Sequence, residues 1–167
     1  MYRTIEDFEF DWSMEIEKTQ KIFKHLNDRA LEHEVMPGYR TIGRLAWHIV
    51  QLIPAMASRT GLKISGPGED DPVPTSARAI LEAYNQAAIS ALDAIKSTWK
   101  DASLQAVDEM YGEKWKRGFT LTVLVHHQIH HRAQITVLMR QAGLEVPGIY
   151  GPAKPEWAHY GMPAPAI

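Results

Sequence analysis

The chain has 167 residues, of which 45% are hydrophobic and 23% charged, so it is long enough to fold as one soluble domain with a sizeable core. Its formal net charge of -2 disfavours nucleic acid as the main partner, and the lack of cysteine excludes disulfides, thiolate metal ligands and a cysteine nucleophile. No run of about 18 apolar residues is present to cross a membrane, and the acidic N-terminus lacks the apolar segment of a signal peptide, which predicts a cytoplasmic protein.

Four segments have apolar residues at the alternating three- and four-residue spacing of an amphipathic helix. The predicted helices cover about residues 11–33, 41–59, 76–99 and 120–142. Residue types that stop or cap helices bound these segments. They are Pro37 and Gly38 after the first segment, Gly61 after the second, Thr75 or Ser76 before the third, and Gly143 after the fourth.

The predicted fold class is all-α, because no run of alternating strand residues competes with the helices. Residues 114–121 (KWKRGFTL) could form only a short extended piece. Four helices of this length favour a four-helix bundle in a single domain, residues 1–167. The stretch 61–74, rich in Pro, Gly and acid, is long enough to cross the length of a bundle and predicts a crossover between the second and third helices. From about residue 144, the Pro- and Gly-rich tail is expected to form a flap without another helix.

Histidines are concentrated in the fourth predicted helix, at His126, His127, His130 and His131. Because residues four apart lie on one helical face, they form two pairs. His127 and His131 share a face with apolar residues and are expected to face the core, where a divalent metal is the most economical common partner for two imidazoles. His48, on the apolar stripe of the second helix, can supply a third ligand. Three neutral histidines leave coordination positions open, as in a catalytic site, and suit zinc, nickel or iron.

From the residues alone, a second interpretation of the pair His127 and His131 is as well supported as metal binding. In it, the pair is a histidine-rich oligomer contact or a pH-sensitive packing patch. His126 and His130 fit that role better, either as contacts or as supports for the ligands. Gln128 follows His127 where a metalloprotease helix has its glutamate base, and no Asp or Glu occurs between Lys114 and Gly143. Peptide hydrolysis therefore lacks its usual base.

Other polar and aromatic residues have weaker signals. Arg132 and Arg140 are expected on a solvated helix face, in the polar sector opposite the core-facing histidines. Aromatic residues around the last helix and the tail could line a pocket mouth or anchor a core or interface. They are Tyr111, Trp115, Tyr150 and Trp157. The remaining histidines, expected to be exposed or capping, are His25, His33 and His159.

Three stretches together resemble the DinB/YfiT-like family over most of the chain. They are TIGRLAWHIVQL around His48, HHQIHHRAQITVLMRQAGL around His127 and His131, and VPGIYGPAKPEW in the tail. The resemblance implies an up-down-down-up bundle with a long connection between the second and third helices, a divalent metal held by three histidines, and frequent homodimers. Carried over, the ligands fall on His48, His127 and His131. Ala133 departs from the family's usual HRGQ form, so helix packing is expected to differ slightly there.

The wider superfamily contains thiol transferases and isomerases, and many members have no established activity. The favoured hypothesis is therefore a metal-dependent, thiol-using transferase or related stress or detoxification enzyme with a small-molecule substrate. Its open metal position would bind a low-molecular-weight thiol and stabilise the thiolate. The alternative is a non-catalytic dimeric metal-binding or sensor protein. Metal-activated hydrolysis is less favoured because the base is missing.

Overall fold

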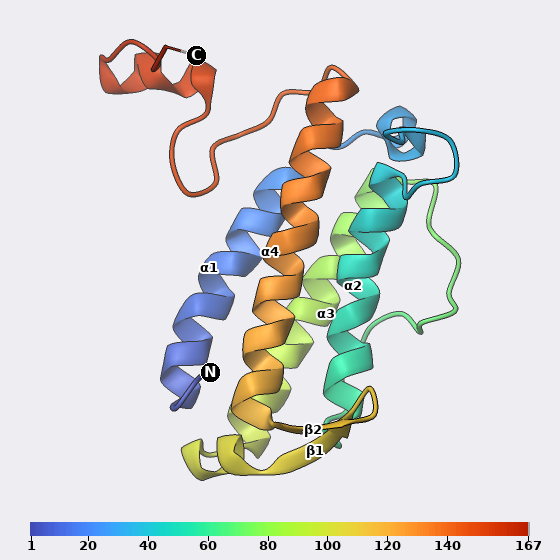
Figure 1. The fold of residues 1–167 in the computed structure, drawn as a ribbon, viewed down its shortest axis with the longest axis vertical. Helices are drawn as coiled ribbons and strands as arrows, with labels where there is room; N and C mark the ends of the chain where they lie inside the picture. The colour runs from blue at the N-terminus through green and yellow to red at the C-terminus, as the bar shows by residue number, and fades with distance from the viewer. Residues whose placement is uncertain (167) are drawn as a thin grey trace.

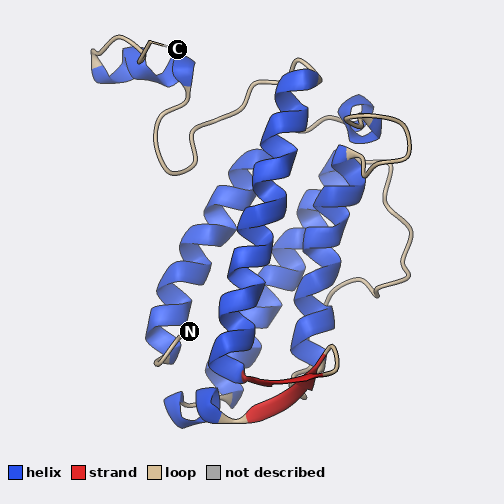
Figure 2. Cartoon of the chain, viewed as in Figure 1, coloured by secondary structure: helices blue, strands red, loops and turns tan. Residues whose placement is uncertain are grey.

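The computed structural model describes residues 1–166, and four long helices packed side by side form its body (Figures 1 and 2). These helices are α1 (Ile5–Phe23), α2 (Ile42–Ser58), α3 (Ala77–Thr98) and α4 (Arg117–Gln141). Short 3₁₀ helices and an antiparallel hairpin complete the described secondary structure: η1 (Asp28–Glu32), η2 (Asp101–Gln105), β1 (Val107–Met110), β2 (Glu113–Lys116) and η3 (Lys154–Tyr160). The all-α class is confirmed.

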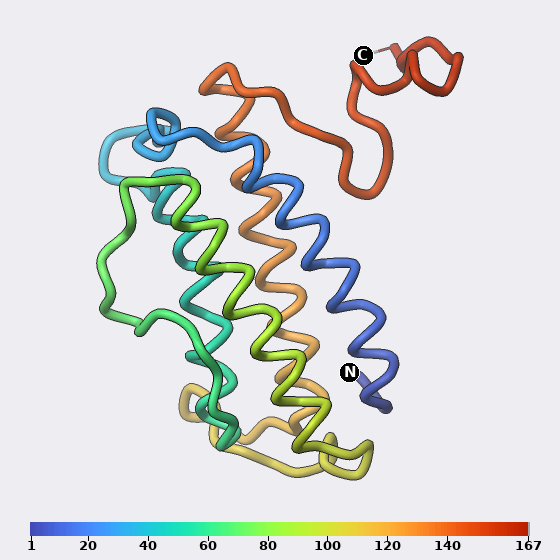
Figure 3. The backbone as a smooth tube through the Cα atoms, turned by 180° about the vertical axis from the view of Figure 1, so that it is seen from behind, coloured from blue at the N-terminus to red at the C-terminus, as the bar shows by residue number. Residues whose placement is uncertain are grey.

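The helices follow the up-down-down-up order. In Figures 1 and 3, α1 and α4 run in one direction, and α2 and α3 run in the other. Both α1 and α2 pack against α3 and against α4. Because α2 and α3 are parallel, the chain must return along the whole bundle between them, and residues 59–76 do so on the outside (Figure 3). The predicted crossover is confirmed.

One buried amide on α2 attaches this crossover to the bundle. The Gln51 amide nitrogen donates to the backbone carbonyls of Gly68, Glu69 and Asp71 at 2.7, 2.9 and 3.1 Å. The indole nitrogen of Trp47 donates to the Asp71 carbonyl at 3.0 Å. These bonds hold the backbone of residues 68–71 against α2, so the crossover has a defined path.

The boundaries predicted for the first helix are wrong at both ends. It begins earlier because Thr4 is its N-cap, with Oγ1 accepting from the Asp7 amide at 3.0 Å. It ends at Phe23 and not near residue 33. The side chain of Asn27 caps η1 by accepting from the Ala30 amide at 2.9 Å, which starts a separate short helix.

The other three helices end close to the predicted positions. Thr41 and Ser76 are the N-caps of α2 and α3. Gly143, just after α4, has a φ of +73°, the left-handed conformation that glycine supplies at a helix end. α4 begins at Arg117, one turn earlier than expected, and the residues before it form β2. The tail differs from expectation, since it contains η3, none of whose residues is buried.

Candidate metal centre

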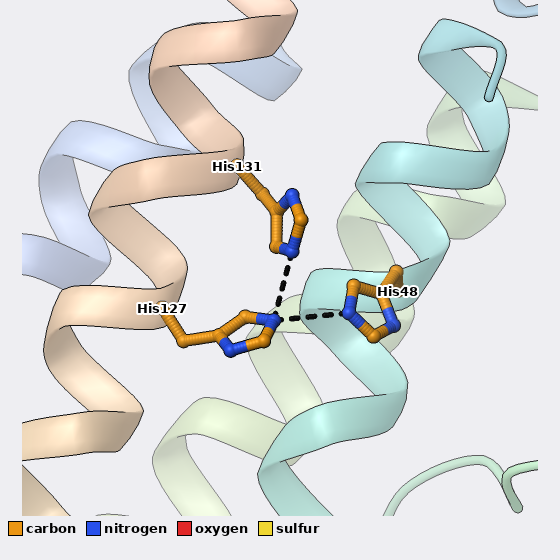
Figure 4. Close-up of side chains that lie close together, drawn as sticks. All are labelled: His48, His127 and His131. Atoms are coloured by element: carbon orange, nitrogen blue, oxygen red, sulfur yellow. Dashed lines mark hydrogen bonds between the residues drawn. The ribbon is translucent and has the colours of Figure 1, made fainter. Parts of the chain in front are cut away.

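The three predicted ligands lie together between α2 and α4 (Figure 4). His48 is in the middle of α2, while His127 and His131 are one turn apart in the middle of α4. The two helices are packed against each other, so the side chains of the pair on α4 reach the single histidine on α2. His131 is buried, and the other two are half-buried.

The imidazoles converge through their Nε2 atoms. The Nε2 of His127 is 3.0 Å from that of His48 and 2.8 Å from that of His131. One nitrogen from each ring lies within 4.8 Å of the others. Within residues 1–166, no other group of three or more histidines or acids comes together in this way.

All three rings are neutral at pH 7. Burial, reinforced by the charge that His131 would carry, lowers the pKa of His48 and of His127 to about 4. Burial also lowers the pKa of His131, against the opposing effect of its hydrogen bond with Gln134. The positive charge of Arg40 contributes to the lowered pKa of every ring. Neutral imidazole is the form that binds metal.

Gln134 fixes which nitrogen of His131 carries the proton. Its amide oxygen accepts from Nδ1 of His131 at 2.7 Å, and this leaves Nε2 with a free lone pair. The amide nitrogen of Gln134 faces Nε2 of His130 at 3.2 Å, which orients the amide. His130 also packs edge-on against His131, with ring centroids 4.9 Å apart. Gln134 was not predicted, although its position three residues after His131 on a helix was a usable signal.

The donor set fits a divalent metal. With the proton of His131 on Nδ1, its Nε2 presents a lone pair to His127. A neutral His127 has at most one proton on Nε2, which cannot point linearly at both His48 and His131. A cation that accepts three lone pairs satisfies all three Nε2 atoms at once. Three histidine nitrogens are also the protein ligand set of open zinc sites.

Arg132 does not lie on a solvated face, and that prediction is wrong. Its side chain is 2% exposed and is 2.6 Å from the Glu15 carboxylate on α1. It also donates to the hydroxyls of Thr19 and Tyr150, each at 3.0 Å. Gln128, one turn before Arg132 on α4, is also only 2% exposed. The reason is that α4 packs against α1 as well as α2, so two sides of the helix are buried.

Glu15 was the missed signal for this buried pair. It lies three residues after Trp12 and four before Thr19, on the apolar stripe of α1. An acid on such a stripe needs a buried cation. Arg140, by contrast, is exposed as predicted.

The remaining predicted residues lie outside the triad. A cavity of about 350 Å³ lies beside His48, and of the four predicted aromatic residues Tyr111 lines it. Trp115 packs against Tyr111, and Tyr150 lies over Arg132. Trp157 lies in η3.

The other histidines also lie outside the triad. His126 and His159 are exposed. The Nδ1 atom of His25 donates to the Lys21 carbonyl at 2.8 Å, and His33 is the C-cap of η1.

Comparison with known proteins places the chain in a family. The sequence model of the DinB family matches residues 1–165. The chain belongs to the DinB family. It is 46% identical over 167 residues to the uncharacterized protein YrdA of Bacillus subtilis (strain 168), covering the whole of both chains.

Two crystal structures of DinB-like proteins share its fold. One, from Bacillus cereus ATCC 10987, has a TM-score of 0.87 and 47% identity, and the match covers 90% of this chain and 100% of that chain. The other is YjoA from Bacillus subtilis, with a TM-score of 0.69 and coverages of 88% and 99%. At 13% identity, it supports the DinB fold alone. None of the described helices is long and apolar enough to span a membrane.

Proposed function

We propose that His48, His127 and His131 bind one divalent metal ion, namely zinc, nickel or ferrous iron, and that this DinB-family protein is a metal-dependent enzyme. Its proposed reaction joins a low-molecular-weight thiol to an electrophilic small molecule. The observation that carries the proposal is the convergence of three neutral Nε2 atoms from two helices, with the proton of one ring held on Nδ1. The group consists of three imidazoles without a carboxylate, and three protein ligands leave coordination positions on the metal open.

The residues around the triad are consistent with thiol chemistry. When bound, a divalent metal lowers the pKa of a coordinated thiol, which makes the sulfur nucleophilic at neutral pH. The chain has no cysteine, so the thiol comes from outside. The reaction forms a carbon–sulfur bond, breaks the bond from that carbon to its leaving group, and releases the leaving group as an anion, while the thiol proton passes to a carboxylate and then to water. Glu69 and Asp70 line the cavity beside His48 and provide an acceptor for that proton.

Metal content tests the site. Tag-free wild-type protein should carry about one metal ion per chain by mass spectrometry of the metals, and His127→Ala should carry almost none. His126→Ala is the matched control, since it removes an adjacent but exposed histidine and should retain the metal. Equal metal content in all three proteins would contradict the site assignment.

Turnover tests the reaction. Zinc-, nickel- and iron-loaded protein is incubated with cysteine, glutathione and other cellular thiols together with 1-chloro-2,4-dinitrobenzene, and thioether formation is followed by absorbance. Conjugation should require both the metal and His127. Metal binding without turnover for any thiol or metal would favour the non-catalytic metal-binding alternative.

We further propose that the protein is a homodimer that uses the outer α1 and α4 surface. Phe10 on α1 is 66% exposed and Phe119 on α4 is 40% exposed. Phe10 also lines a groove with His126, which supports a contact role for that histidine in the proposed dimer. Phe10→Glu should convert the dimer to a monomer in sedimentation equilibrium, whereas Ile89→Glu, at an exposed apolar position on α3, should not. A wild-type monomer would contradict this proposal.

A further inference from the structure

An apolar cavity of about 470 Å³ adjoins the triad on the His131 side. Its volume lies in the range of small-molecule sites in proteins. Its lining comes from the loop before α2, the first turn of α2 and the C-terminal half of α4. The lining residues are Val35, Tyr39, Arg40, Leu45, His131, Gln134, Val137 and Leu138.

Three apolar side chains of this cavity are largely exposed. The exposed fraction is 56% for Val35, 61% for Tyr39 and 54% for Val137. Val35 and Tyr39 come from the loop and Val137 comes from α4, so the exposed apolar surface surrounds one hollow and is not scattered. Covering such a surface with an apolar ligand is favourable because it removes that surface from water.

The charged group in the lining of this cavity is positive. Arg40 is its only charged lining residue among those described, and no acid lines it. Arg40 makes no ion pair with any described acid, although its charge reaches all three imidazoles. The cavity on the His48 side is different, since Arg44 there is balanced by Glu69 and Asp70. An anion therefore prefers the His131 side.

We propose that this cavity binds the electrophilic substrate, and that this substrate is an apolar molecule with a carboxylate or similar anionic group. The apolar part lies between Val35, Tyr39 and Val137, and the anionic group lies at Arg40. Because His131 belongs to the same lining, a molecule held this way lies against the triad. This assignment rests on the proposed function for its chemistry, but its binding geometry is independent of the metal.

Binding of a matched pair of small molecules tests the cavity. The full chain, freed of metal with a chelator, is titrated by calorimetry with 4-phenylbutyrate and with 4-phenylbutan-1-ol, which differ only in the anionic group. The acid should bind about fivefold more tightly than the alcohol, as expected for a solvent-exposed arginine contact. The same titrations on zinc-loaded protein show whether the ligand and the metal are held together.

Two pairs of variants separate charge from apolar contact. Arg40→Gln should weaken the acid about fivefold and leave the alcohol unchanged, whereas Arg78→Gln, which removes an equal charge from the exposed face of α3, should change neither. Val137→Gln should weaken both ligands, and Ile89→Gln, at a similarly exposed apolar position on α3, should weaken neither. All four positions are exposed, so folding should persist in each variant.

The proposal is overturned if wild-type protein binds neither ligand, if Arg40→Gln behaves like Arg78→Gln, or if Val137→Gln behaves like Ile89→Gln. Failure of the proposed function is seen separately. If wild-type protein lacks metal while its affinity for 4-phenylbutyrate still requires Arg40, the cavity assignment stands and the metal-dependent reaction does not. If metal and thiol turnover are present but Arg40→Gln leaves the affinity for 4-phenylbutyrate unchanged, only the cavity assignment is wrong.

Discussion

Replacing Arg132 with Met should lower the free energy of unfolding by about 3 kcal/mol, because it leaves a buried carboxylate without one of its two counter-charges. The Arg132 side chain is 2% exposed and lies 2.6 Å from the Glu15 carboxylate, which is 6% exposed. Removing one partner of a buried pair typically costs about 3 to 5 kcal/mol. The lower value applies here because Lys18 remains 2.7 Å from Glu15.

The loss is measured by urea unfolding at pH 7, followed by circular dichroism at 222 nm. Arg140→Met is the matched control on the same helix, since Arg140 is exposed and, within residues 1–166, its side chain bonds only the Thr136 carbonyl, at 3.0 Å. The control should change the free energy of unfolding by less than about 0.5 kcal/mol. Equal losses in the two variants would refute the reasoning that a buried charge pair joins α1 to α4.

The pH dependence of stability provides a second readout of the same pair. Burial raises the pKa of Glu15, but the hydrogen bond from Lys18 and the charge and hydrogen bond of Arg132 outweigh it, so the pKa lies below its ordinary value of 4.5. A carboxyl with a depressed folded-state pKa stabilises the fold above its unfolded-state pKa, and this contribution is lost as the pH falls through the folded value. Wild-type stability should therefore decline below about pH 4.5, and the decline should be smaller in Arg132→Met.

Three further predictions concern the triad and the core. Since the pKa of His48 and of His127 is about 4 and the pKa of His131 lies below its ordinary value of 6.5, zinc affinity in a chelator competition should fall most steeply near pH 4; a steepest fall between pH 7 and 6 would contradict these values. Gln134→Leu should weaken zinc about tenfold in the same assay, while Gln141→Leu, exposed at the end of α4, should not. Buried Tyr84 on α3 donates its hydroxyl to the amide oxygen of buried Gln128 on α4 at 2.9 Å, so Tyr84→Phe leaves that oxygen unpaired and should cost about 1 to 2 kcal/mol in urea unfolding; an unchanged midpoint would show that the bond is not needed.

Local signals predicted most of the fold. Thr41 and Ser76 cap helices because their hydroxyls accept a backbone amide three residues later, and Gly143 ends α4 because it can adopt a positive φ. The end of α1 was missed for the same kind of reason. The apolar spacing continues past Phe23, but Asn27 offers the backbone a competing cap and starts η1.

The sequence by itself determined the four helices, the crossover, and the placing of His127 and His131 on one face, because spacing of 3.6 residues per turn sets directions around a helix axis. Only the tertiary structure decided which helices pack against the sides of α4 and what its polar residues meet. His48 completes the triad because α2 is a neighbour of α4, and Arg132 is buried because Glu15 on α1 supplies its charge partner. Those partners lie about 80 and 117 residues away along the chain, so no local pattern around the residues of α4 contains them.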